Sequence, residues 1–279
     1  MKINNLKYIL LAFALIAGIQ LVAQDYEEKM VVPLSNPGSK GSLEVGLIMG
    51  SIKVEGYNGK EVIVTAKTVK NEERPGRKSR NNESSDLTGL KKISSNAFEL
   101  EIEEKGNHVE ISSSHYNQKI DLEIKVPINF SLDLGTVNNG NIYVSNVTGS
   151  HEISNVNGDI EMFAISGSVV ASTVNGKIII AFDEVAPNTP MAFANMNKQI
   201  DLTLPSNTKA TLKMDSKMGE VYTDFDTEIV KTDPQIKKST DEGVYKVSVS
   251  QVVTAKINGG GPELKFKNFN GDIIVRKKK

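Results

Sequence analysis

The sequence predicts an all-β fold, a parallel β-solenoid with laps of about 18–22 residues. Three observations predict it: glycines recur every nine residues from 140 to 176, apolar residues keep fixed places after each glycine, and alternate units resemble each other. Beyond the N-terminal apolar run, no segment has the 3.6-residue apolar period of an amphipathic helix. Residues 25–279 are predicted to form a single solenoid domain, with residues 135–182 as its most regular repeats.

The nine-residue unit favours a solenoid over a chain of hairpins, although Asn-Gly between apolar runs ordinarily signals a hairpin turn. Apolar residues stand two, four and seven places after the glycine; after Gly140 they are Ile142, Val144 and Val147. Offsets two and four share one face of a strand, whereas offset seven has the opposite parity. A bend before offset seven would turn that residue inward again, and strands separated by bends are typical of a solenoid.

Glycine and asparagine are predicted to make the corners, because both tolerate the positive φ that tight bends require. Stacked laps place like on like, which explains why "TVNNGNIYV", "NVNGDIEMF" and "TVNGKIIIA" match at two-unit spacing. Asparagines at such corners are expected to form a hydrogen-bonded ladder. The predicted structural corner residues are Asn139, Gly140, Gly149, Asn157, Gly158, Gly167, Asn175, Gly176, Asn270 and Gly271.

Less regular copies of the corner extend the prediction in both directions. Downstream they occupy residues 196–204, 217–225 and 268–276, and upstream Gly50 and Gly59 lie nine residues apart. The solenoid is therefore expected to begin near residue 41, to stop at a polar mobile loop over residues 71–96, and to resume near residue 119. Alternating segments at 98–104, 108–114, 119–127 and 241–257 predict further strands, some of them antiparallel, near the insertion and near the C-terminus.

The N-terminus predicts export. Lys2 and Lys7 precede an uncharged, mostly apolar run over residues 8–22, and residues 1–24 have the layout of a signal peptide cleaved near Ala23 or Gln24. The alternative is an uncleaved anchor, but the run is shorter than the roughly 20 residues of a spanning helix. The chain has no cysteine, which excludes disulfides, thiolate metal sites, a cysteine nucleophile and a lipid-modified cysteine. A periplasmic, cell-surface or secreted location is expected, with no transmembrane segment after cleavage.

With these corners in place, the chain resembles the bacterial putative-adhesin domains of the DUF4097-like family, a domain of unknown function. The matching segments are "GSLEVGLIMGSIKVEGYNGKEVIVTAK" and "DLEIKVPINFSLDLGTVNNGNIYVSNVTGSHEISNVNGDIEMF". The resemblance covers most of the chain after the signal and rests on the style of the repeats. It implies a right-handed parallel β-helix in an adhesin head, and it brings no site residues.

No catalytic, cofactor-binding or metal-binding residue is predicted. His108, His115 and His151 are read as structural or surface residues. The carboxylate pairs at strand spacing are read as exposed charge, although each could bind calcium or serve as acid and base: Glu101 with Glu103, Asp121 with Glu123, and Asp224 with Asp226. A formal net charge of −1 does not suggest nucleic-acid binding. The basic tail, residues 276–279, is expected to solvate the terminus.

The sequence thus suggests an exported, non-catalytic protein that binds an unidentified protein or glycan of the cell envelope. The first alternative is a polysaccharide-active β-helix enzyme, a lyase or glycoside hydrolase. That reading lacks clustered arginines, because three of the four arginines fall in the polar loop. The second alternative is a scaffold that assembles end to end through open solenoid edges. The sequence leaves the oligomeric state open.

Overall fold

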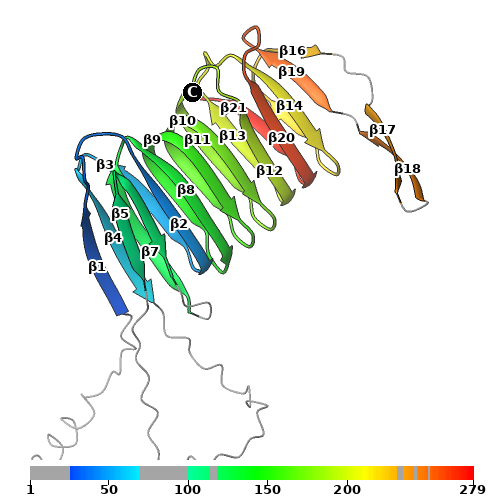
Figure 1. Ribbon diagram of the computed structural model, residues 1–279. Coiled ribbons are helices and arrows are strands. Elements are labelled where there is room, and N and C mark those ends of the chain that lie inside the picture. Colours follow the sequence, from blue (N-terminus) through cyan, green and yellow to red (C-terminus); the bar gives the residue numbers. More distant parts are fainter. Residues whose placement is uncertain (1–25, 69–99, 114–117, 231–234, 242–243, 251) are drawn as a thin grey trace, which may run out of the picture. The chain divides into compact units, whose positions relative to one another are not determined.

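The computed structural model describes residues 26–68, 100–113, 118–230, 235–241, 244–250 and 252–279 (Figure 1). The predicted signal peptide and the polar loop at 71–96 lie outside these residues. The described chain is all-β, with a mixed sheet of 19 strands and a separate two-stranded sheet. None of the described residues forms a helix long and apolar enough to cross a membrane.

Parallel strands that follow the predicted glycine corners form one array, which we call the first wall. Successive members pair in register, so that Ile52, Ile142, Ile160, Ile178 and Ile200 lie next to one another and are fully buried. In stacking order the first wall consists of β7 (Ile120–Pro127), β3 (Ile52–Tyr57), the first part of β9 (Ile142–Asn155), the first part of β10 (Ile160–Thr173), β11 (Ile178–Val185), β13 (Ile200–Leu204), β21 (Ile273–Lys277) and β15 (Val221–Thr223).

A second parallel array, the second wall, is joined to the first by bends within the long strands β9 and β10. Asn146 (φ 58°) and Ala164 (φ 54°) make these bends with positive φ, and the residues after them, Val147 and Ile165, are buried. The bend therefore places the residue at offset seven in the core. The second wall consists of β6 (His108–Ser112), β2 (Gly41–Met49), β8 (Phe130–Asn138), the later parts of β9 and β10, β12 (Met191–Asn197), β20 (Glu263–Asn270) and β14 (Ala210–Ser216).

Antiparallel pairs flank the parallel arrays. In the N-terminal part, β4 (Glu61–Thr68) pairs with β7 and with β1 (Tyr26–Pro33), and β5 (Glu101–Lys105) pairs with β6. In the C-terminal part, β19 (Val253–Ile257) pairs with β14 and with β16 (Thr227–Val230). The hairpin of β17 (Gln235–Asp241) and β18 (Val244–Ser250) forms the two-stranded sheet.

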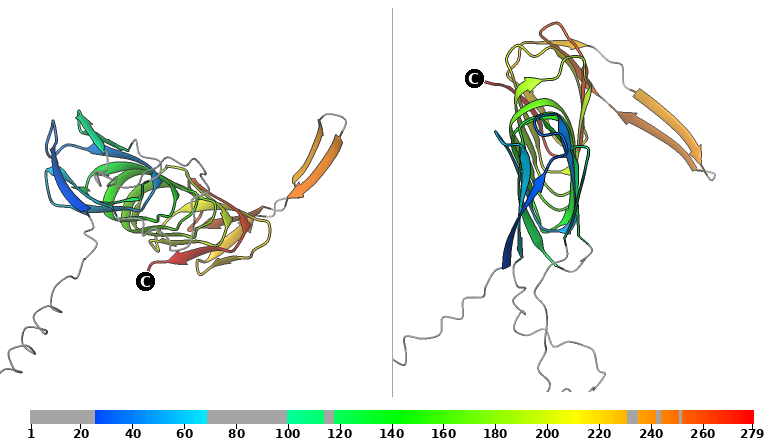
Figure 2. Two further views of the ribbon diagram at one scale, coloured as in Figure 1. Left: turned by 90° about the horizontal axis from the view of Figure 1, so that it is seen from below. Right: turned by 60° about the vertical axis from the view of Figure 1, so that its left-hand side comes forward.

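The laps do not stack in sequence order, which corrects the expectation that the copy at 217–225 follows the one at 196–204. Strand β21 lies between β13 and β15, and β20 lies between β12 and β14. The corner hydrogen bonds explain this order, because Asn268 donates to the carbonyl of Lys198 and Ser216 donates to that of Gly271. In the same way, the lap of β2 and β3 lies between β6–β7 and β8–β9, and Figure 2 shows the stack from two further directions.

Both walls turn alternate residues into one hydrophobic core cluster. Ladders of like side chains fill it, as stacking in register requires. Phe193 and Phe266 are paired in register on β12 and β20, and their rings stack with centroids 5.2 Å apart. Outward-facing residues of the same strands are thereby left in straight rows across each wall, and these rows are the surfaces available for binding.

Candidate functional site

The predicted glycine corners lie where one lap comes closest to the next. A Cβ on Gly158 would lie 1.9 Å from the carbonyl oxygen of Gly140, and a Cβ on Gly176 would lie 1.8 Å from that of Gly158. Gly140 itself meets the carbonyl of Gly50 in the same way, at 1.7 Å. Their φ values are not positive, so glycine is not required here for a left-handed conformation. It is required because any side chain would collide with the backbone of the next lap.

Gly149 and Gly167 occupy the other bend, just after the turn within β9 and β10. They are paired in register, and Gly167 has a φ of 119°. Gly271 combines the two requirements, with a φ of 145° and a hypothetical Cβ 2.2 Å from the carbonyl of Lys198. Lys198 replaces glycine at its own corner and still adopts a φ of 77°. The bend glycines therefore serve conformation as well as close packing.

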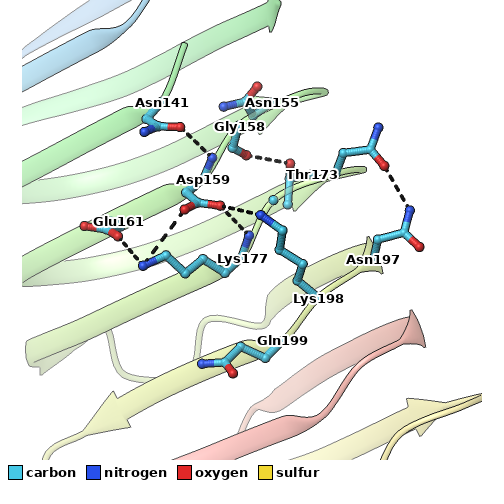
Figure 3. Close-up of polar contacts among 12 residues, drawn as sticks. Asn141, Asn155, Gly158, Asp159, Glu161, Thr173, Lys177, Asn197, Lys198 and Gln199 are labelled. Atoms are coloured by element: carbon cyan, nitrogen blue, oxygen red, sulfur yellow. Dashed lines mark hydrogen bonds and ion pairs between the residues drawn. The ribbon is translucent and has the colours of Figure 1, made fainter. Parts of the chain in front are cut away.

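A buried polar ladder, which the sequence analysis missed, runs behind the corner glycines. Each member donates a hydrogen bond to the corner carbonyl of the neighbouring lap. The distances lie between 2.7 and 3.1 Å, and Figure 3 shows the bond from Thr173 to Gly158. The members are Thr136, Asn155, Thr173, Asn195 and Asn268. Their signal in the sequence is a Thr or Asn three residues before the corner residue, which is Lys198 after Asn195 and glycine elsewhere, or four residues before it at Thr136.

The exposed asparagine ladder shares Asn157 and Asn175 with the prediction, and its other two members are Asn138 and Asn197. Asn157 donates to Asn138, Asn175 donates to Asn157, and Asn197 donates to Asn175, at 3.0, 2.8 and 2.9 Å. Asn139, which was predicted to belong to this ladder, is instead an extra residue with a φ of 54°. The corner at 136–140 is one residue longer than its neighbours, since Thr136 pairs with Asn155 while Ile142 pairs with Ile160. Asn270 pairs with Asn197 through the backbone.

A charged group on the outer side of the same corner continues the lap-to-lap contacts (Figure 3). Asp159 accepts a hydrogen bond from the backbone N–H of Lys177 at 2.9 Å and lies 3.5 Å from the Lys198 ammonium. The Lys177 ammonium lies 2.7 Å from Glu161, and this hydrogen bond raises the pKa of Lys177. Both carboxylates bind lysine residues of neighbouring laps, so their role is to hold adjacent laps together.

Two of the three carboxylate pairs named from the sequence form hydrogen bonds or ion pairs with neighbouring segments of the chain. Asp121 accepts the backbone N–H of Ser51 at 2.8 Å, and Glu123 lies 3.0 Å from the Lys67 ammonium. Asp224 accepts the backbone N–H of Lys277 at 2.6 Å, and Asp226 lies 3.3 Å from the same residue's ammonium. Glu101 and Glu103 lie exposed on β5. Within the described residues, no group of three or more His, Asp or Glu side chains is placed to hold a metal ion.

The three histidines fall in three different settings. His108 is exposed on β6, with Nε2 3.6 Å from Glu44, and His115 lies outside the described residues. His151 is 2% exposed and stands in register between Leu132 and Val169, with no hydrogen-bond partner for either ring nitrogen in the described part of the chain. Burial lowers its pKa to about 4, an effect that the nearby backbone of Ser166 opposes. His151 is therefore a neutral member of an apolar ladder.

The basic tail, expected to solvate the terminus, is mostly exposed, and three of its four residues also form ion pairs within the molecule. Arg276 binds Asp201 through two nitrogens, both at 2.9 Å. The Lys278 ammonium lies 2.6 Å from Asp183, and Lys277 contacts Asp224 and Asp226 as described above. These contacts attach the end of β21 to neighbouring strands, which leaves less of the tail's charge for anionic partners.

The outer face of the first wall carries two aromatic rings that the sequence analysis did not select. Tyr143 and Phe163 are partly exposed, and their centroids lie 5.8 Å apart at an interplanar angle of 40°. A shallow hollow of about 430 Å³ beside them is lined by Lys53, Glu55, Tyr143 and Ser145. We call these five residues the aromatic platform. Their signal in the sequence is an outward position, three or five residues after a corner glycine.

Together, the fold and these surfaces define an all-β protein with stacked parallel strands, glycine corners and outward-facing rows. No protein-family model and no curated protein matches the chain, so membership of the DUF4097-like family stays an expectation. Among solved structures, a putative cell adhesion protein from Clostridium sporogenes is similar at 13% identity and a TM-score of 0.40, over 91% of this chain and 100% of that one.

Two further similar structures come from Bacteroides and Parabacteroides. A putative adhesin from Bacteroides fragilis has 9% identity and a TM-score of 0.35, over 94% of this chain and 100% of that one. A putative lipid binding protein from Parabacteroides distasonis has 8% identity and a TM-score of 0.27, over 91% and 97%. These similarities are too distant to assign a function to this chain.

Proposed function

We propose that this chain is an exported, non-catalytic β-solenoid that acts as an adhesin-like protein of the cell envelope or cell surface. In this proposal the laps wind into one parallel coil, right-handed as the sequence resemblance implies. The in-register pairing of Ile142, Ile160, Ile178 and Ile200 supports the coil. The partner is a protein or a glycan of the envelope, and it binds the outer face of the first wall.

The aromatic platform carries the binding part of the proposal. Aromatic faces pack against the C–H surfaces of sugars and against apolar side chains, and they lose little conformational entropy on binding. Lys53 and Glu55 stand beside the rings, and neither has an ion-pair partner among the described residues. Partly exposed rings beside unpaired charges are the arrangement that a glycan or a polar protein surface would need.

The surroundings of the carboxylates support a non-catalytic role. Asp121, Glu123, Asp159 and Asp224 are each held by a backbone N–H or by a lysine of a neighbouring strand. A glycosidase needs two carboxyl groups that are free to face one substrate. End-to-end assembly is disfavoured as well, because antiparallel strands cover the parallel laps at β7 and β14.

A glycan array combined with an envelope pull-down, both with the full chain, tests the proposal. We expect a Tyr143→Ala, Phe163→Ala double variant to lose at least about tenfold in affinity for the captured partner, because hot-spot aromatics typically contribute that much or more. Tyr222→Ala is the matched control, since Tyr222 is a 52% exposed tyrosine on the same wall. Blank arrays and pull-downs, or equal loss in the control, would refute the platform as the binding site.

A further inference from the structure

The outer face of the second wall carries a row of side chains whose charge changes sign along the stack. From β2 to β14, register places them side by side in the order Glu44, Asp133, Glu152, Val170, Ala192, Lys265 and Lys213, and Glu110 on β6 precedes Glu44. Carboxylates occupy the first three places and ammonium groups the last two. Val170, at the centre of the row, is 45% exposed. Neighbouring strands are about 4.8 Å apart, so the row spans roughly 30 Å.

The next outward row lies two residues further along each of these strands, and we call it the floor. It consists of small side chains over most of its length. Its first five members are Gly46, Gly135, Ser154, Ser172 and Ala194. Two hollows lie over this floor. One, of about 360 Å³, is lined by residues that include Gly46 and Val156, and the other, of about 380 Å³, by residues that include Ser172 and Phe269. Small residues allow another backbone to approach closely, as in sheet-on-sheet packing.

The next row, at the edge of the wall, is an apolar ridge. Its members follow one another in register, and four of them are among the most exposed apolar residues of the described chain: Ile48 at 48%, Val137 at 40%, Met196 at 52% and Phe269 at 53%. Such a continuous exposed apolar strip usually marks an interaction surface. The ridge consists of Ile48, Val137, Val156, Val174, Met196 and Phe269.

We propose that the second wall binds the second wall of another copy of this chain, related by a two-fold axis that runs parallel to β10 through Val170 and Val174. This axis reverses the stacking direction and keeps the strand direction. It places Glu44 opposite the partner copy's Lys213 and Asp133 opposite its Lys265. Each contact occurs twice, as in any two-fold interface.

The same axis also brings the apolar ridges of the two copies into contact. Val137 meets the second copy's Phe269, Val156 meets its Met196, and Val174 meets its own counterpart. A second copy stacked in the same direction would instead place Glu44, Asp133 and Glu152 opposite themselves, and like charges across an interface are strongly disfavoured. The charge row therefore selects one of the two face-to-face orientations.

The area and the charges set the strength of this contact. Seven strands by these three outward rows cover roughly 650 Å² per copy, or about 1,300 Å² in total, which is near the lower limit of specific interfaces. Asp133 and Lys265 have no ion-pair partner within the described chain and are free to pair between copies, whereas Lys213 already contacts Glu263 at 2.5 Å. We therefore expect a dimer with a micromolar dissociation constant that weakens as salt is added.

This inference goes beyond the proposed function and does not depend on the identity of any other partner. It does have a consequence for that function, because the aromatic platform lies on the other wall and stays uncovered. A dimer would present two platforms, and two linked sites bind a repetitive surface more tightly than one.

Sedimentation velocity of the full chain, over about 1–300 µM, tests the dimer. The wild type is expected to dimerise, and Asp133→Lys and Lys265→Asp are each expected to weaken self-association at least about 30-fold, because each variant faces itself with two like-charge pairs. An equimolar mixture of these two variants restores both pairs, so the mixture is expected to dimerise as the wild type does. Glu61→Lys, an exposed charge reversal on β4, is the matched control and should leave the dimer intact.

Several outcomes would overturn the proposal. A wild type that stays monomeric up to 300 µM, single variants that dimerise like the wild type, or a mixture that stays monomeric would each do so. If a single variant loses its far-UV circular dichroism signal, Val170→Arg provides the same test, because it places two arginines against each other at the axis. A dimer that survives Val170→Arg would likewise overturn it. Loss of glycan or protein capture with an intact dimer would refute only the proposed function.

Discussion

His151 should make the stability of this protein depend on pH, and the dependence can be worked out from its place in the core. The residue is 2% exposed, and burial lowers its pKa to about 4 from an ordinary value of 6.5. The folded state therefore excludes a proton that the unfolded state binds below pH 6.5. Stability contributed by the neutral ring is fully present above pH 6.5 and is lost as the pH falls toward 4.

The magnitude follows from the two pKa values. Each pKa unit corresponds to about 1.4 kcal/mol, so the full loss is about 3 kcal/mol by pH 4, and the loss at pH 5 is about 2 kcal/mol. His151→Val removes this titration and matches the apolar neighbours Leu132 and Val169. It also removes two buried nitrogens without hydrogen-bond partners, which should stabilise the protein by about 1–3 kcal/mol even at pH 7.5.

Urea unfolding of the wild type and of His151→Val, at pH 7.5 and at pH 5, measures the effect. The advantage of the variant should grow by about 2 kcal/mol between the two pH values. An advantage that is the same within about 0.5 kcal/mol at both pH values would refute the reasoning.

Three further changes test the corners and the tail. Gly158→Ala should destabilise the fold by several kcal/mol, because its Cβ would lie 1.9 Å from a backbone oxygen, while Gly46→Ala, with nothing within 4 Å of its Cβ, should change the melting temperature little. Asn155→Leu should cost about 1–3 kcal/mol by leaving the Gly140 carbonyl unpaired, and Asn155→Thr should cost less, since threonine has this role at 173; equal urea midpoints would contradict this. Arg276→Ala should cost at most about 1 kcal/mol, and the cost should shrink in high salt, because its side chain is 53% exposed.

The periodicity of the sequence predicted the strand-rich fold and the positions of the central strands. Offsets two, four and seven identify buried residues at Ile142, Val144 and Val147 because register repeats the same environment at each lap. The parity change at offset seven corresponds to the positive φ of Asn146 and Ala164. An alanine at this position carries no local signal, so the bend could be placed only from the pattern around it.

Long-range order could not be predicted in the same way. The copies at 217–225 and 268–276 have similar corners, and a local pattern does not say which of them pairs with β13. That choice depends on a hydrogen bond between residues 70 apart, from Asn268 to Lys198. The aromatic platform was missed for a related reason, since Tyr143 and Phe163 meet only after two laps are stacked.

The insertion of β20 and β21 into the stack has a consequence for how the chain folds. Strands β14 and β15 come earlier in the chain, but they find their parallel partners only when residues 263–277 are available. Strands β12 and β13 pair with β10 and β11, and their other edges stay open until the same residues arrive. Sheets that depend on such distant pairing form slowly, and their unpaired edges stay open to other chains meanwhile. Synthesis of the C-terminal strands is therefore the event that allows the interior of the stack to close, and a chain that lacks them would expose edges in its middle.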